Sequence, residues 1–158
     1  AAAHLPALLG IACLLWGIAI SELPARDAMH GTSGLGAAVR GGQEGRFWRQ
    51  WLSVLLLGLL FTAPIAQQLH APALSLTLGC GLLWISSLAC LLGQSTRGGR
   101  SFLSLFLFGL YLASQVRDIA WFDQLGFNGS ADSASRLAGL MIGAAALTLA
   151  FVLRRRSR

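Results

Sequence analysis

The stretch LAGLMIGAAALTLAFVL, residues 137–153, decides the fold class of this chain. It holds seventeen residues without a charge, and it is flanked by Arg136 on one side and by Arg154, Arg155, Arg156 and Arg158 on the other. At a rise of about 1.5 Å per residue, such a helix crosses most of a hydrocarbon core of roughly 30 Å. Because backbone amides in lipid must be paired within their own segment, the stretch is predicted to be a transmembrane helix.

The composition of the whole chain agrees with a membrane protein. Of 158 residues, 55% are hydrophobic and 11% are charged, whereas soluble domains carry about 25% charged residues. The net charge is +6, and all twelve basic residues are arginines that stand at the ends of apolar runs. They form no basic face with polar or aromatic readers, so we exclude nucleic acid and expect anionic lipid as their partner.

Four further apolar segments precede this one, and together they predict an all-α, polytopic transmembrane helix bundle in a single domain, residues 1–158. The predicted spans are residues 5–21, 51–66, 73–93, 101–122 and 137–153. Residues 22–50 are predicted to be a polar cytoplasmic loop, because glycines disfavour a stable helix there. Pro64 is expected to kink or end the second span. A four-span variant without the first segment stays open.

Arginine counts predict the orientation of these spans. The loops after the first and third spans contain four and two arginines, whereas the loop after the second contains none and that after the fourth has none before Arg136. Cationic loops stay in the cytoplasm, so the N-terminus is predicted outside and the C-terminus inside. The Ala-, Leu- and Arg-rich composition is typical of a GC-rich bacterial genome. A bacterial inner (cytoplasmic) membrane is therefore the predicted location.

Small residues recur every four positions at the start of the last span. Ser135, Gly139 and Gly143 form one face, and the two glycines make a G-x-x-x-G motif. Small residues at this spacing let two helix backbones approach closely. The face is predicted to pack against the protein's own helices or against a second copy of the chain.

Polar residues are expected to gather at the outer surface. The predicted cluster comprises Gln67, Gln68, His70, Gln115, Arg117, Asp118, Asp123, Asn128, Asp132 and Arg136. Two carboxylates that share a proton can activate water, which makes Asp118 and Asp132 candidate catalytic residues with Asn128 as an orienting group. The alternative is a local ion pair between Arg117 and one of the two aspartates.

The segment before the last span resembles the corresponding part of the lipoprotein signal peptidases. Phe127, Asn128, Ala131 and Asp132 match their F-N-x-A-D motif, with one extra residue in this chain. The resemblance implies an outer-face aspartyl hydrolase in which Asp132 is one of two catalytic aspartates. The region of Asp118 in this chain does not match the family's N-x-x-D-R motif, and the family's early D-x-x-x-K motif is missing here. The family has four spans, whereas five are predicted for this chain. These departures place the hydrolase among the alternatives.

No cofactor or metal is expected. Cys13, Cys80 and Cys90 lie in apolar runs, without C-x-x-C or metal-ligand spacing. A haem- or quinone-binding membrane subunit that uses His70, Trp121 and Arg117 at the outer edge is a further alternative.

The leading functional prediction is a non-enzymatic protein, and the hydrolase is the enzymatic alternative. The first four spans lack ionisable residues at mid-depth, where transporters usually keep them. We therefore predict an accessory or scaffold subunit of a membrane complex, or part of a transporter. Its expected partners are the lipid bilayer and other membrane subunits or a second copy of itself.

Overall fold

The computed structural model describes residues 5–25, 42–68, 72–96, 98–116, 119–121, 123, 125, 126, 128 and 130–156. These residues contain five α-helices and one short 3-10 helix, without strands, so the prediction of an all-α chain is confirmed. The elements are α1 (Leu5–Ile20), η2 (Leu23–Ala25), α4 (Gly42–Gln68), α5 (Pro72–Thr96), α6 (Arg100–Gln115) and α7 (Ser133–Arg156).

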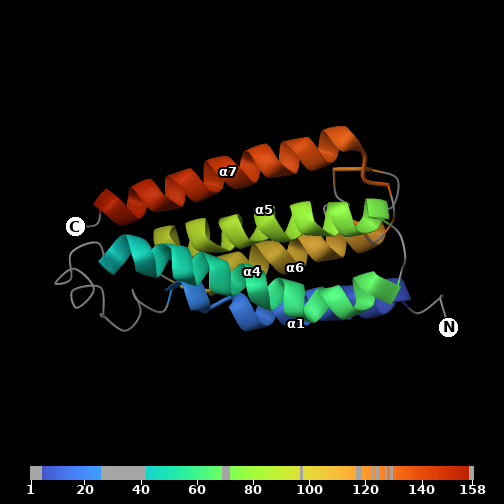
Figure 1. Ribbon diagram of the computed structural model, residues 1–158, viewed down its shortest axis with the longest axis horizontal. Coiled ribbons are helices and arrows are strands. Elements are labelled where there is room, and N and C mark those ends of the chain that lie inside the picture. The colour runs from blue at the N-terminus through green and yellow to red at the C-terminus, as the bar shows by residue number, and fades with distance from the viewer. Residues whose placement is uncertain are drawn as a thin grey trace.

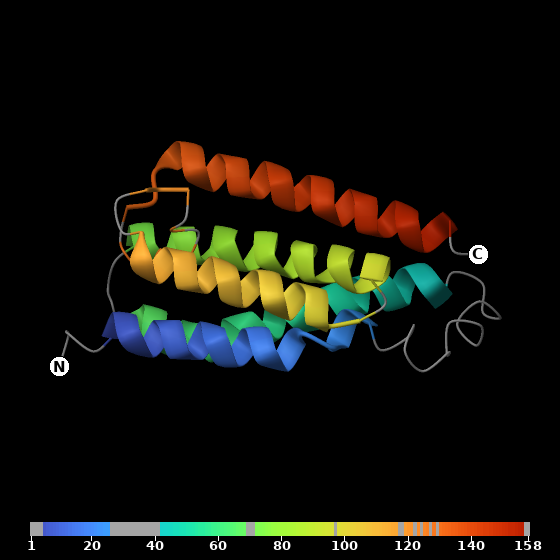
Figure 2. The ribbon, with the colours of Figure 1, turned by 180° about the vertical axis from the view of Figure 1, so that it is seen from behind.

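Successive helices run in opposite directions along one common axis (Figures 1 and 2). The start of α1 and the end of α7 consequently lie at opposite ends of the bundle. We call one end the cationic end, because the starts of α4 and α6 and the end of α7 bring arginines there: Arg46, Arg49, Arg100, Arg154, Arg155 and Arg156. The other end, where α7 begins, is called the loop end.

Helix α5 is the centre of the bundle. It packs against α4, α6 and α7, and η2 also contacts it. Of the most apolar 18-residue stretch of α5, 56% is buried inside the bundle, against 17% of the corresponding stretch of α4 and 22% of that of α7. The sequence explains this position, because α5 carries no charged residue and has apolar or small side chains on all sides.

Trp16 fixes α1 against α4 on one side of the bundle. Its ring is fully buried, and its indole Nε1 donates a hydrogen bond of 3.0 Å to the carbonyl of Val54. The ring fits because residue 58 is glycine, where a Cβ atom would lie 2.9 Å from Cε2 of Trp16. In the same way, Gly17 of α1 leaves room for the ring of Phe106 on α6. Large rings against glycines thus set the spacing of α1, α4 and α6.

Three helices are long and apolar enough to cross a membrane, namely α4, α5 and α7. The residues concerned are Glu44–Gln68, Ala73–Thr96 and Ser133–Arg156, and Ala7–Ile20 of α1 is a shorter apolar helix. The outward faces carry large exposed apolar side chains, among them Ile11, Leu60, Phe108, Leu137 and Met141. In water such faces would be costly, and hydrocarbon around them would remove that cost.

The small-residue face of α7 points into the bundle. Ser135, Gly139 and Gly143 are buried, as are Ala146 and Ala150 further along the same face. Among the described residues, α7 packs chiefly on α5. Whether this face also serves assembly with a second copy stays a prediction.

Helix α4 begins nine residues before the predicted start of the second span, at Gly42 instead of Trp51. The glycines around it were expected to prevent a helix, but Phe47 is fully buried and its ring lies 5.6 Å from that of Phe151 on α7. This contact with a distant part of the chain outweighs the low helix propensity of glycine. Pro64 lies inside α4, which continues to Gln68.

Helix α6 ends at Gln115 and does not reach Phe122, where the fourth span was predicted to end. Val116 has an extended backbone, with φ −104° and ψ 90°. The amide of Val116 donates to the carbonyl of Leu112, which closes the last turn. The chain then turns across the loop end instead of extending the helix.

Candidate functional site: a capped apolar cavity

A buried carboxylate organises the chain between α6 and α7. Asp123 is fully buried and accepts hydrogen bonds from the backbone amides of Asn128, at 3.1 and 3.2 Å, and of Ser130, at 2.9 Å. The hydroxyl of Ser130 donates a further bond of 3.2 Å. A buried carboxylate is tolerated only where such donors replace the water that it has lost. Asp123 therefore holds together this segment, which we call the capping loop (the described residues between 119 and 130).

The capping loop is attached to the ends of α5 and α6. The side-chain amide of Asn128 donates a bond of 2.8 Å to the carbonyl of Ala113, in the last turn of α6. Gly126 has a φ of +79°, a conformation that favours glycine. A Cβ atom at Gly126 would lie 3.0 Å from Cδ1 of Leu74 on α5. The loop thus lies across both helices.

Asp132 caps the N-terminus of α7. Its Oδ1 accepts a hydrogen bond of 2.7 Å from the amide of Ser135, and the Ser135 hydroxyl accepts one of 3.1 Å from the amide of Asp132. This reciprocal pair satisfies amides that the helix itself leaves unpaired. The hydrogen bonds from Ser135, with the nearby Arg136 charge, hold the pKa of Asp132 below its usual value. Asp132 is therefore a charged capping residue at neutral pH.

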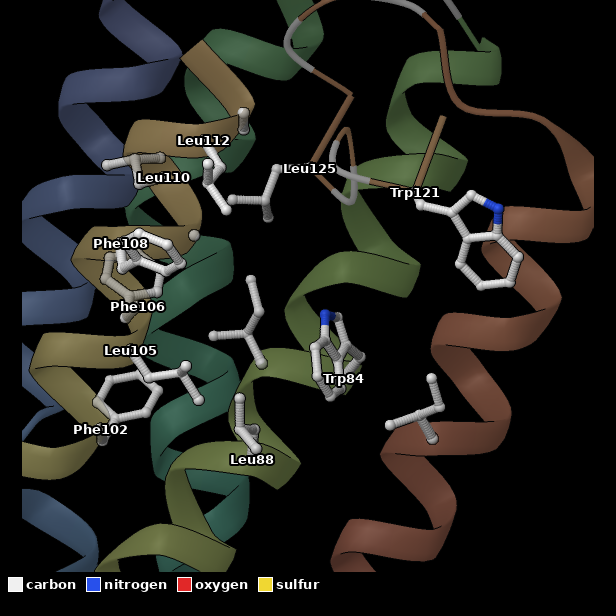
Figure 3. A pocket seen from close by; sticks show the side chains of 14 residues that line it. Trp84, Leu88, Phe102, Leu105, Phe106, Phe108, Leu110, Leu112, Trp121 and Leu125 are labelled. Carbon is white, nitrogen blue, oxygen red and sulfur yellow. The ribbon is translucent and has the colours of Figure 1, made fainter. Parts of the chain in front are cut away.

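An apolar cavity of about 410 Å³ lies between α5, α6 and α7, below the capping loop. Phe102 and Phe106 line it from α6, Trp84 from α5 and Trp121 from the loop (Figure 3). Ile142 is the residue of α7 that lines it. Its volume falls within the range of small-molecule sites, roughly 300–1,000 Å³. The cavity can hold an apolar group, and its lining offers few groups that could bind a polar one.

The cationic end joins α4 to α7 through polar and aromatic contacts. Arg155 pairs with Glu44 at 2.7 Å, and its guanidinium lies 4.5 Å from the ring centroid of Phe151. Arg154 Nη1 donates a bond of 3.1 Å to Oε1 of Gln50, whose amide in turn donates to the carbonyl of Leu23. Exposed ion pairs contribute little alone, so the buried rings carry most of the stabilisation here.

The residues predicted as an outer-face site are only partly brought together. Asn128 and Asp132 both lie at the loop end, but each binds the backbone or Ser135 and not the other. Gln115 is exposed at the end of α6, and Arg136 is half-buried, with Nη2 donating 3.1 Å to the carbonyl of Ala131. His70, Arg117 and Asp118 lie outside the described residues.

Two features of the site were not found from the sequence. Asp123 was counted only as one polar residue of the outer surface, yet it is the anchor of the capping loop. Its position among Trp121, Leu125 and Phe127 was the available signal, since an acid within an apolar segment needs internal donors. The cavity had no sequence signal, because its lining residues are ordinary apolar side chains.

Comparison with protein families, with curated proteins and with solved structures finds no match for this chain. Within the described residues, no three His, Cys, Asp or Glu side chains meet in a possible metal site.

Proposed function

We propose that the chain is a five-span inner-membrane protein, with its N-terminus outside and its C-terminus inside, and that it acts as a non-enzymatic accessory or scaffold subunit of a larger membrane assembly. The observation that carries the topology is the cationic end. Of the arginines that the structure describes, all except Arg136 lie there. Arginines stay on the cytoplasmic side, so the cationic end faces the cytosol.

The two short helices fit this topology as spans. Each of α1 and α6 has 16 residues, or about 24 Å of helix. That is a few ångströms less than a typical hydrocarbon core, a mismatch that local thinning of the bilayer accommodates at modest cost. Both run alongside the longer helices, and both expose large apolar side chains such as Ile11 and Phe108.

The roles of the acidic side chains favour a scaffold over a hydrolase. Glu44 pairs with Arg155, Asp123 holds the capping loop and Asp132 caps α7. The carboxylate of Asp132 is already engaged at the N-terminus of α7, where its Oδ1 accepts the amide of Ser135 at 2.7 Å. The aspartyl hydrolase with Asp118 and Asp132 is therefore the second candidate, and a haem or quinone site near His70 is the third.

Single cysteines test the topology. In a chain with Cys13, Cys80 and Cys90 replaced by alanine, Ser133→Cys reports the loop end and Thr96→Cys the cationic end; both native side chains are exposed. A membrane-impermeant maleimide is expected to label Ser133→Cys in intact spheroplasts and Thr96→Cys only after lysis. The reverse pattern, or equal labelling, would overturn the proposed orientation.

The subunit role is tested by the size of the native assembly. After gentle solubilisation, a tagged chain of 16.7 kDa is expected to migrate as part of a much larger, defined complex. The double variant Asp118→Asn/Asp132→Asn is expected to migrate in the same way and to complement a deletion of the native gene. A chain that migrates alone contradicts the subunit role. Loss of complementation with assembly intact would favour the hydrolase, and a haem spectrum would favour the third candidate.

A further inference from the structure

We draw no further inference here: the strongest candidate, the cavity between α5, α6 and α7 below the capping loop, has an apolar lining, and nothing in the described part of the structure shows what covers it.

Discussion

Gly143 of α7 lies directly against the backbone of Trp84 on α5: a Cβ atom at position 143 would come within 2.9 Å of the Trp84 Cα atom. Backbone atoms cannot move aside as the tip of a flexible side chain can. The close packing of α7 on α5 therefore depends on the absence of a side chain at this position.

The variant Gly143→Leu is expected to push α7 away from α5. Overpacking of this kind costs about 1–3 kcal/mol of unfolding free energy, and Gly139→Leu is expected to act similarly because Gly139 is also buried. Unfolding in mixed detergent micelles measures the loss. Ala144→Leu, at an exposed position of the same helix, is the control, and equal stability of Gly143→Leu and Ala144→Leu would contradict this account.

The variant Asp123→Ala is expected to open the capping loop. The amides of Asn128 and Ser130 would lose their acceptor, and a hydrogen bond to a charged group contributes about 1.5–3 kcal/mol. Hydrogen exchange at these two amides is expected to become at least tenfold faster. Gln115→Ala, at an exposed residue of the loop end, is expected to leave both exchange rates unchanged. Slow exchange in Asp123→Ala would show that other contacts hold the loop.

Acidification is expected to fray the first turn of α7. The pKa of Asp132 in the folded protein is lowered, so its contribution is complete above the ordinary carboxyl value of about 3.9 and is lost as the pH falls through the lower, folded value. Exchange of the Ser135 amide between pH 5 and pH 2 measures this loss. Asp132→Asn keeps a capping acceptor that does not titrate, so its exchange should lose the acid-dependent step, whereas Asp132→Ala should be frayed at every pH.

The start of α4 is expected to depend on a buried ring more than on an ion pair. Removal of a buried phenylalanine ring costs about 3–5 kcal/mol, whereas an exposed ion pair contributes about 0–1 kcal/mol. Phe47→Ala should therefore release the first turns of α4, and Glu44→Gln should change stability little. Proteolysis near Arg46 and Arg49 by trypsin reports the difference. Similar cleavage of both variants would show that the ion pair with Arg155 matters as much as the ring.

Charge and hydropathy patterns predicted those helices whose first and last residues depend on the nearby sequence. The first span was predicted at residues 5–21, and α1 covers Leu5–Ile20, because uncharged residues end at Glu22. The long apolar helices α5 and α7 were likewise predicted, since lipid selects such segments by composition alone. The all-α class followed from the same patterns.

The remaining structure depends on contacts that local patterns do not contain. Residues 42–50 are helical because Phe47 meets Phe151, more than one hundred positions later. Helix α6 ends early where the capping loop binds Ala113 through Asn128. The cavity arises from the relative placement of three helices, which no single segment determines. His70, Arg117 and Asp118 lie outside the described residues, so the predicted outer-face site around them stays a prediction.

The position of α7 has a consequence for biosynthesis. Its main neighbour is α5, and Phe151 of α7 packs against rings of α4. Both α4 and α5 precede α7 in the chain. When α7 leaves the ribosome, the surface on which it docks has already been made. A chain interrupted after α6 would therefore keep the part of the docking surface that α5 supplies, and a separately synthesised α7 that binds there would also bring Phe151 to the start of α4.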